Sequence, residues 1–214
     1  YRFPNRPARV LVVGAGAGND VAAALRAGGS HVTAVEIDPA VIEIGRRYHP
    51  ERPYDDPRVE IVRDDARAWF ARSNGRYDRI VFGLLDAHTA IGGLNARLDH
   101  FVYTRESFAP ARRLLGEGGL GLVGFATVPQ AKAARLHHLL EQTFPHCSTP
   151  MRVPQTVFGP GGVVFIAGNA PIEIDLPDAR SIGPLPADVV VPTDDWPNLY
   201  LRAPRIPTPF ILLA

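Results

Sequence analysis

Short apolar runs alternate with helix-like segments through most of this 214-residue chain, and this alternation limits the possible folds more than any other feature. The expected strands are 8–13, 31–37, 58–62, 77–85, 119–125 and 162–168, and the expected helices are 20–28, 39–49, 65–73, 104–115 and 130–144. Apolar strands separated by helices are typical of a parallel sheet covered on both faces. We therefore predict an α/β fold with a doubly wound, mostly parallel sheet and helices on both faces.

The chain is expected to divide into one domain and a tail. Residues 1–168 carry the alternating pattern, whereas residues 169–214 are proline-rich and show no clear periodicity, so we interpret them as a tail packed on the domain. The sequence begins with Tyr1 and ends in the apolar stretch "PTPFILLA", which leads us to expect a piece of a longer protein. That ending fits either the start of a membrane segment or a buried strand.

Composition excludes several classes of protein. The formal net charge is +1, and acidic and basic residues are interspersed. Without a basic stripe, we expect no nucleic-acid partner and a small molecule as the ligand. Cys147 is the single cysteine, which excludes an internal disulfide and a cysteine-rich zinc site.

A glycine-rich loop follows the first expected strand, in the stretch "VVGAGAGNDV". A dinucleotide-binding loop has the pattern G-x-G-x-x-G, and here Asn19 replaces the third glycine. Asp20 also brings a negative charge to the helix N-terminus, where a dinucleotide would place its pyrophosphate. S-adenosylmethionine carries an ammonium and a sulfonium and no phosphate, so the loop favours this cofactor. An NAD-dependent oxidoreductase is the less favoured alternative.

Acidic residues follow the next two expected strands, at the edge of the sheet where ligands bind in such folds. Glu36 ends the second strand and is placed to accept bonds from ribose hydroxyls, although a solvated strand end is the simpler alternative. Asp38 precedes Pro39 and fits a helix N-cap. Asp65 fits either a contact to the adenine amine or an N-cap, and Asp64 is the rival for the first role.

Five stretches of the sequence together resemble the spermidine synthase family, within the class I S-adenosylmethionine-dependent methyltransferase fold. They are "VLVVGAGAGNDV", "VTAVEIDPAVIEIGRRY", "DDPRVEIVRDDARAW", "YDRIVFGLLD" and "FVYTRESFAPARRLLGEGG". The resemblance covers roughly residues 8–125. It implies S-adenosylmethionine, or its decarboxylated form, as the cofactor.

The resemblance also implies which residues contact the cofactor. The methionine part lies over Gly14 to Gly18, the ribose lies by Glu36, and the adenine lies by Asp65 and Ala66. The full set of expected cofactor contacts is Gly14, Ala15, Gly16, Gly18, Asn19, Asp20, Glu36, Ile37, Asp65 and Ala66.

Two departures from the family pattern affect the expected chemistry. The family's loop aspartate falls on Ala17, a loss for which Asp20 is placed to compensate. The family's aspartate pair after the fourth strand falls on Gly83 and Asp86, so the first acid is missing. We therefore expect a poor spermidine synthase that transfers a methyl or aminopropyl group to an unidentified acceptor, with amines among the candidates. The alternative is an inactive nucleoside-binding sensor or scaffold.

The expected catalytic residues are Asp86 and His88. A histidine after the fourth strand suits acid–base work because it titrates near neutral pH, although a loop histidine without a chemical role is equally compatible. The acceptor pocket is assigned to Asp99, Tyr103 and Asp195, with a packing role as the alternative. No metal site is expected: His137 and His138 are neighbours on one helix, point in different directions, and are interpreted as structural.

The stretch "PTDDWPNLYL" (192–201) resembles a tail of spermidine-synthase-like domains in larger membrane-anchored bacterial proteins. This resemblance implies a cytoplasmic location, either free or as the cytosolic domain of a membrane-anchored protein. A homodimer is counted among the expected assemblies.

Overall fold

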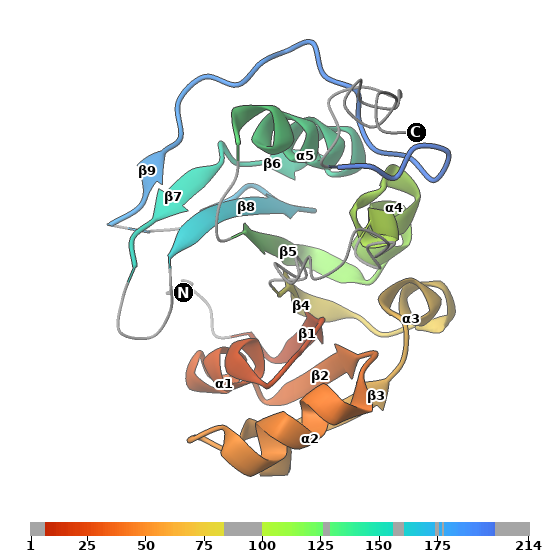
Figure 1. The fold of residues 1–214 in the computed structure, drawn as a ribbon, viewed down its shortest axis with the longest axis vertical. Coiled ribbons are helices and arrows are strands. Elements are labelled where there is room, and N and C mark those ends of the chain that lie inside the picture. Colours follow the sequence, from red (N-terminus) through yellow and green to blue (C-terminus); the bar gives the residue numbers. More distant parts are fainter. Residues whose placement is uncertain are drawn as a thin grey trace, which may run out of the picture.

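The structure, a computed structural model, describes residues 7–83, 100–125, 129–155, 161–173, 176 and 178–199. Its centre is one sheet with the strand order β3-β2-β1-β4-β5-β8-β7-β9, in which β6 also pairs with β8 (Figure 1). The strands are β1 (Arg9–Val13), β2 (His31–Glu36), β3 (Val59–Arg63), β4 (Tyr77–Phe82), β5 (Leu115–Phe125), β6 (His146–Cys147), β7 (Met151–Val153), β8 (Gly162–Gly168) and β9 (Arg180–Ser181).

The first five strands pair in parallel, and β8 joins β5 in the antiparallel direction. The connecting helices are α1 (Asn19–Arg26), α2 (Pro39–Tyr48), α3 (Ala66–Arg72), α4 (Arg105–Arg113) and α5 (Gln130–Thr143), with short 3-10 helices η1 (Pro53–Asp55) and η2 (His100–Tyr103). The predicted α/β class and the mostly parallel sheet are confirmed.

Helices cover both faces of the sheet. Consecutive side chains of a strand point to opposite faces, so each strand contributes to the apolar core on both sides. In β1, Val10 and Val12 belong to a core cluster that also contains Val21 of α1 and Ile42 of α2. The intervening Leu11 and Val13 belong to a second cluster, which includes residues of α3, α4 and α5. The uninterrupted apolar run in β1 is therefore explained by burial on both sides.

The tail packs on the parallel part of the fold and also extends the sheet. β9 pairs with β7, and the segment that follows runs along α5 to α4 (Figure 1). His138 of α5 lies 3.3 Å from the carbonyl oxygen of Pro186, and the backbone N–H of Arg105 in α4 donates to the carbonyl of Pro192 (3.1 Å). Leu199 is fully buried in the core. Where one domain ends and a tail begins stays a prediction.

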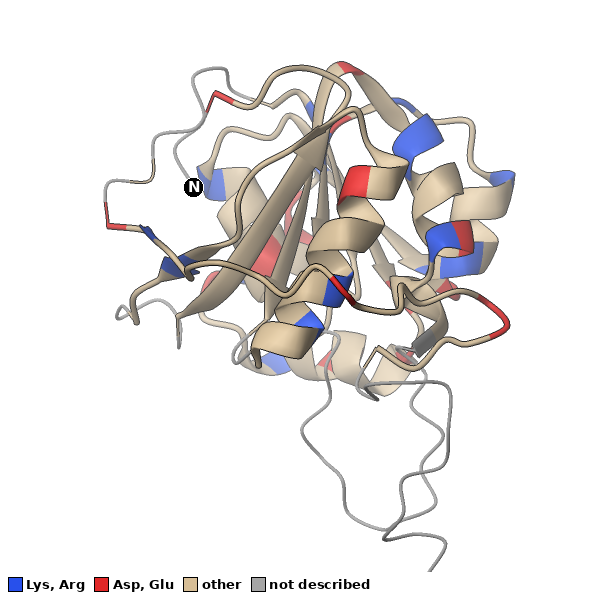
Figure 2. Cartoon of the chain, turned by 90° about the horizontal axis from the view of Figure 1, so that it is seen from above, with Lys and Arg blue, Asp and Glu red and all other residues tan. Residues whose placement is uncertain are grey.

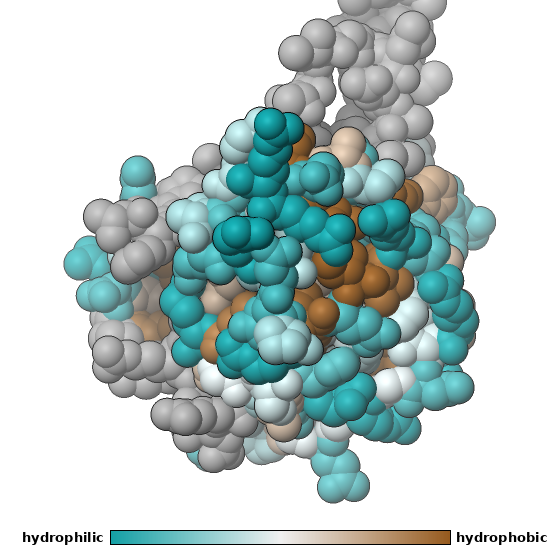
Figure 3. Space-filling model, turned by 90° about the horizontal axis from the view of Figure 1, so that it is seen from below, coloured by the Kyte–Doolittle hydropathy of each residue, from teal (hydrophilic) through white to brown (hydrophobic). Residues whose placement is uncertain are grey.

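The surface mixes charges of both signs. Figure 2 shows basic and acidic residues interspersed over the helices and loops that the structure describes. Figure 3, which views the end of the molecule that carries α2, shows apolar side chains gathered near the middle of that face among hydrophilic ones. No helix within the described ranges has the length and apolar character needed to cross a membrane.

Candidate nucleoside-binding site

The carboxyl ends of β1, β2, β3 and β4 lie along one edge of the sheet, because these strands pair in parallel in register. The glycine loop follows β1, and Ile37 follows β2. Asp65 comes shortly after β3, and Gly83 directly follows β4. Residues separated by up to about seventy positions in the sequence therefore share one edge, which is the ligand-binding edge of open α/β sheets.

The glycine loop adopts a backbone that requires glycine. Gly14, Gly16 and Gly18 have φ angles of 65°, 56° and 101°, a left-handed region that side chains rarely tolerate. The loop is tied to the neighbouring strand by the Ala15 N–H, which donates to the carbonyl of Val35 (3.0 Å). Among the described residues, and apart from its two chain neighbours, the atom nearest to a Cβ added at Gly16 would be the Gly14 carbonyl oxygen, 3.9 Å away.

Glu36 connects this loop to β2. Its Oε2 accepts a hydrogen bond from the Gly16 N–H (2.8 Å), and its Oε1 accepts one from the Asp38 N–H (2.9 Å). The residue is only 9% exposed. A carboxylate has about four acceptor sites, so both oxygens can still receive ribose hydroxyls. The solvated strand end considered above does not describe this buried, hydrogen-bonded carboxylate.

Tyr54 and Gly45 support the loop from its other side, and neither was recognised in the sequence. The Tyr54 hydroxyl donates to the carbonyl of Gly16 (2.5 Å), and burial, followed by the charge of Glu36, raises the pKa of the phenol. A Cβ on Gly45 would lie 2.5 Å from the carbonyl oxygen of Ala17. Glycine at this position of α2 therefore allows the helix to contact the loop directly.

The acids after β2 and β3 act as helix caps. Asp38 accepts from the Ala40 N–H (2.8 Å). Asp65 Oδ1 accepts from the backbone N–H groups of the first turn of α3, at 2.9 and 3.0 Å. Within the described residues Asp65 Oδ2 accepts no hydrogen bond, and Asp65 is exposed. Asp64, the rival for the adenine contact, forms an ion pair with Arg72.

The end of β4 differs from the other strand ends because it has no room for a side chain. A Cβ on Gly83 would lie 2.8 Å from the Gly14 carbonyl oxygen and 3.0 Å from Oδ2 of Asp20. Burial raises the pKa of the Asp20 carboxyl. Within the described residues this carboxyl has no hydrogen-bond or ion-pair partner. The carboxylate of Asp20, on α1, therefore lies beside position 83, where the resemblance places the family's first aspartate.

The remaining predicted residues are distributed as follows. Ile37 directly follows β2 and is 53% exposed. Asn19 is exposed and its Oδ1 lies 3.1 Å from His49 Nε2. Tyr103 is fully buried against Phe125, with ring centroids 5.1 Å apart. Its packing alternative therefore gains support.

Asp195 is exposed in the tail, in the turn closed by the Thr193–Trp196 bridge. The catalytic predictions Asp86 and His88 and the pocket prediction Asp99 lie outside the described residues. Their roles, and the cofactor contacts listed from the sequence, stay predictions.

His137 and His138 form a small polar cluster away from this edge. His137 Nδ1 lies 3.5 Å from the Cys147 sulfur, and both histidines contact Glu141, at 3.3 and 3.0 Å. Burial raises the pKa of the Cys147 thiol to about 12, so the thiol is protonated and unreactive at neutral pH. Within the described ranges no group of metal-ligating side chains is assembled.

A mostly parallel sheet, a left-handed glycine loop and an acid at the end of β2 are features of Rossmann-like α/β folds, which include the class I methyltransferase fold. A family model described as "Spermine/spermidine synthase domain" matches residues 2–148. The chain belongs to this family.

Known relatives agree with this placement. The polyamine aminopropyltransferase of Korarchaeum cryptofilum is 29% identical over 143 residues, covering 64% of this chain and 42% of the relative. The crystal structure of spermidine synthase from Thermotoga maritima gives a TM-score of 0.59 at 19% identity, covering 77% of this chain and 55% of that one. Human methyltransferase-like protein 13 in complex with SAH gives a TM-score of 0.57 at 18% identity, covering 76% of this chain and 72% of that one.

These relatives are longer than the chain, which spans between 22% and 52% of the length of four curated aminopropyltransferases. At such low identity, the two structural likenesses show the fold alone.

Proposed function

We propose that this domain binds decarboxylated S-adenosylmethionine and transfers its aminopropyl group to an amine acceptor. The observation that carries the proposal is the Glu36 carboxylate, buried and hydrogen-bonded to the glycine loop at Gly16. Membership of the spermine/spermidine synthase domain family supports the type of reaction, because the curated relatives are named polyamine aminopropyltransferases. A cytoplasmic location, a membrane tether and a homodimer remain predictions.

The residues along the sheet edge fit an adenosyl cofactor. The cofactor would approach the backbone beside Gly16, where an added Cβ would meet no described atom closer than 3.9 Å, apart from the chain neighbours. Glu36 would hold the ribose hydroxyls, exposed Ile37 would pack on the adenosine, and the unused oxygen of Asp65 would accept from the adenine amine. Asp20 offers a carboxylate to the positively charged end of the cofactor. Because this end lacks the pyrophosphate of NAD, the charge of Asp20 is favourable.

The proposed reaction is a displacement at carbon. The cofactor supplies an electrophilic carbon bonded to a positively charged sulfur. The amine nitrogen of the acceptor donates its lone pair to that carbon, the carbon–sulfur bond breaks with its electrons passing to sulfur, and methylthioadenosine leaves. One proton of the new ammonium passes to a base. The protein's main contribution is alignment of the two reactants. In well-oriented systems such alignment lowers the activation barrier by about 7 to 11 kcal/mol.

We expect putrescine to be a poor acceptor. Gly83 occupies the position of the family's first aspartate and provides neither a base nor a carboxylate to hold a diamine. Asp86 and His88 remain the predicted residues for proton removal. We therefore favour an amine other than putrescine as the acceptor, and methyl transfer from S-adenosylmethionine is the alternative reaction.

A sensor or scaffold is the second candidate function, and one observation favours it. A Cβ at Gly83 would collide with the Gly14 carbonyl, so the local backbone has no place for the missing acid. A domain that keeps its nucleoside site while losing the chemistry would show this combination.

Product analysis by mass spectrometry separates these possibilities. The protein is incubated with each adenosyl cofactor and a panel of amines that includes putrescine, and methylthioadenosine and S-adenosylhomocysteine are quantified. We expect methylthioadenosine formation with an amine other than putrescine. Efficient spermidine formation that Asp86→Asn abolishes would contradict the acceptor proposal and make Asp86 the base. Binding without any product would replace the enzyme proposal with the sensor.

A further inference from the structure

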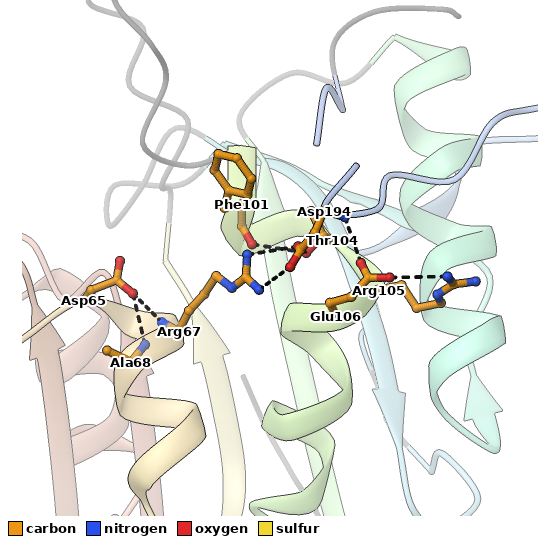
Figure 4. A network of polar contacts seen from close by, with 8 residues as sticks. All are labelled: Asp65, Arg67, Ala68, Phe101, Thr104, Arg105, Glu106 and Asp194. Atoms are coloured by element: carbon orange, nitrogen blue, oxygen red, sulfur yellow. Dashed lines mark hydrogen bonds and ion pairs between the residues drawn. The ribbon is translucent and has the colours of Figure 1, made fainter. Parts of the chain in front are cut away.

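Asp194 of the tail is fixed by side chains from two other segments (Figure 4). Its Oδ1 and Oδ2 accept from the two guanidinium nitrogens of Arg67, at 2.9 and 2.6 Å, and Thr104 Oγ1 also donates to Oδ1 (2.8 Å). Bidentate arginine–carboxylate pairs fix geometry as well as charge. The bonds from Arg67, with help from Thr104, lower the pKa of the Asp194 carboxyl. Asp194 is therefore an ionised residue that connects the tail to α3 and to the start of α4.

Further contacts hold the same tail segment. The Asp194 N–H donates to Glu106 Oε2 (2.9 Å), and the Arg105 N–H donates to the carbonyl of Pro192 (3.1 Å). Beyond the turn, Arg135 of α5 donates to the carbonyl of Leu199 (2.8 Å). The tail between 192 and 199 is thus anchored at several points, with Asp194 at its centre.

This connection lies at the ligand-binding edge of the sheet. The α3 helix begins just after β3, at the edge where the nucleoside is expected, and Arg67 is its second residue. The Arg67 N–H donates to Asp65 Oδ1 (2.9 Å), so the arginine that binds the tail also fixes the acid expected to contact adenine. Figure 4 shows Asp65 and Asp194 on opposite sides of the Arg67 side chain.

The α3 helix depends on such support because it has only seven residues. Helices this short are not stable by themselves in water. Arg113 of α4 donates to the carbonyl of Phe70 near the C-terminal end of α3 (3.1 Å), and Arg67 ties the N-terminal end to the tail. Loss of the N-terminal tie would free the turn that carries Asp65.

We propose that the Arg67–Asp194–Thr104 network is a latch through which the tail holds the adenosine side of the site in its binding shape. Arg67 and Asp194 are then positioning residues, and the proposal rests on the proposed nucleoside binding. Coupling between two sites is reciprocal, so a bound nucleoside must also stabilise the docked tail. If the tail packed on the domain without affecting the site, ligand binding would not change the stability of the docked tail.

Calorimetry with methylthioadenosine tests the latch, using wild type, Asp194→Asn, Arg67→Gln and the double variant. We expect each single change to weaken binding about fivefold or more, and the double variant to be no weaker than the singles because both remove one interaction. Asp188→Asn, at an exposed position elsewhere in the tail, is the matched control and should bind as wild type does.

Hydrogen exchange provides a second test, because a purely structural anchor would leave the exchange rates of the tail independent of the ligand. In wild type, methylthioadenosine should slow exchange at the N–H groups of Asp194 and Trp196, which donate to Glu106 and Thr193. In Asp194→Asn this protection should be lost while the rest of the sheet still exchanges slowly.

Unchanged affinity in folded Asp194→Asn, together with tail exchange that ignores the ligand, would overturn the latch and leave the proposed function intact. If wild type bound no adenosyl compound at all, the proposed function and the latch would both be overturned. The two failures are therefore distinguishable from the wild-type titration.

Discussion

The ends of β1 and β4 are neighbours in the sheet, yet they are built in opposite ways. The β1 end carries a glycine loop whose backbone is bonded on both sides, by Glu36 at the N–H of Gly16 and by Tyr54 at its carbonyl. The β4 end carries Gly83, beside which even a methyl group would collide with the loop. The backbone at the β1 end is held in place by side chains, whereas the β4 end has a glycine at the position where the resemblance places the family's first aspartate. Because of this difference, we propose cofactor binding and polyamine synthesis as separate properties of the domain, to be tested separately.

The largest expected effect is at the glycine loop itself. Gly16→Val should weaken methylthioadenosine binding by about 100-fold, or about 2.7 kcal/mol, because the branched side chain would occupy the place proposed for the cofactor; this lies near the upper end of the roughly 1–3 kcal/mol cost of overpacking. Calorimetry measures the loss. Gly183→Val is the matched control, since Gly183 also has a positive φ (88°) and no described atom lies within 4 Å of its Cβ position. Normal binding by folded Gly16→Val would mean that the loop is only a turn.

Glu36→Ala should come next. It removes the acceptor for two backbone N–H groups and the expected ribose ligand, and should weaken adenosyl-cofactor binding by roughly 1–3 kcal/mol. Glu36→Gln, which keeps one acceptor oxygen, should fall between Ala and wild type. Exposed Glu43→Ala is the control. If Glu36→Ala leaves the affinity unchanged while a urea titration shows a folded protein, the ribose assignment is wrong.

The β4 end is tested by restoring the missing acid. Gly83→Asp should not raise spermidine formation, and should lower the free energy of unfolding by about 1–3 kcal/mol, because its Cβ collides with the backbone of Gly14. Gly124→Ala, where an added Cβ meets nothing within 4 Å, provides the control for adding a side chain in the sheet. A stable Gly83→Asp variant with strong putrescine activity would show that the two strand ends do not differ as described.

A smaller effect concerns the charge of Asp20. Burial raises its pKa in the folded state above the ordinary 3.8, so the folded protein retains the proton more readily than the unfolded chain, and this residue reduces stability as pH rises. Asp20→Asn should therefore raise the free energy of unfolding modestly at pH 7. The difference should shrink below the ordinary pKa, where the carboxyl is protonated in both states. Urea titrations at several pH values, with Asp188→Asn alongside, measure it; a gain that is equal at every pH would contradict the burial argument.

The sequence predicted the parts of the fold that local patterns specify. All six expected strands and five expected helices are present, because their apolar periodicity and caps, such as Asp38 before Pro39, act within a few residues. The short strands β6, β7 and β9 were missed, since two or three residues carry no periodicity and their pairing depends on β8 and on each other. The β5 strand begins at Leu115, earlier than the expected start at residue 119. The early start was missed because the glycines of "GEGG" are typical of a turn.

Residues of the candidate site could be predicted where they directly follow a strand. Glu36 and the glycines could be found this way. Tyr54 could not, because its hydroxyl reaches a carbonyl 38 positions away. Arg67 and Asp194 are 127 positions apart, and no sequence motif in either segment predicts that they form a pair. Such contacts depend on how the tail docks on α3 and α4, which only the folded chain determines.

The central claim, an adenosyl site without the acid arrangement for spermidine synthesis, is tested most directly by one calorimetric panel. Wild type and Glu36→Ala are titrated with methylthioadenosine, decarboxylated S-adenosylmethionine, S-adenosylmethionine and NAD. We expect wild type to bind the adenosyl sulfur compounds and to bind NAD far more weakly, and we expect Glu36→Ala to lower the affinity for the adenosyl compounds. Preferential binding of NAD, or no binding of any adenosyl compound by folded protein, would contradict it.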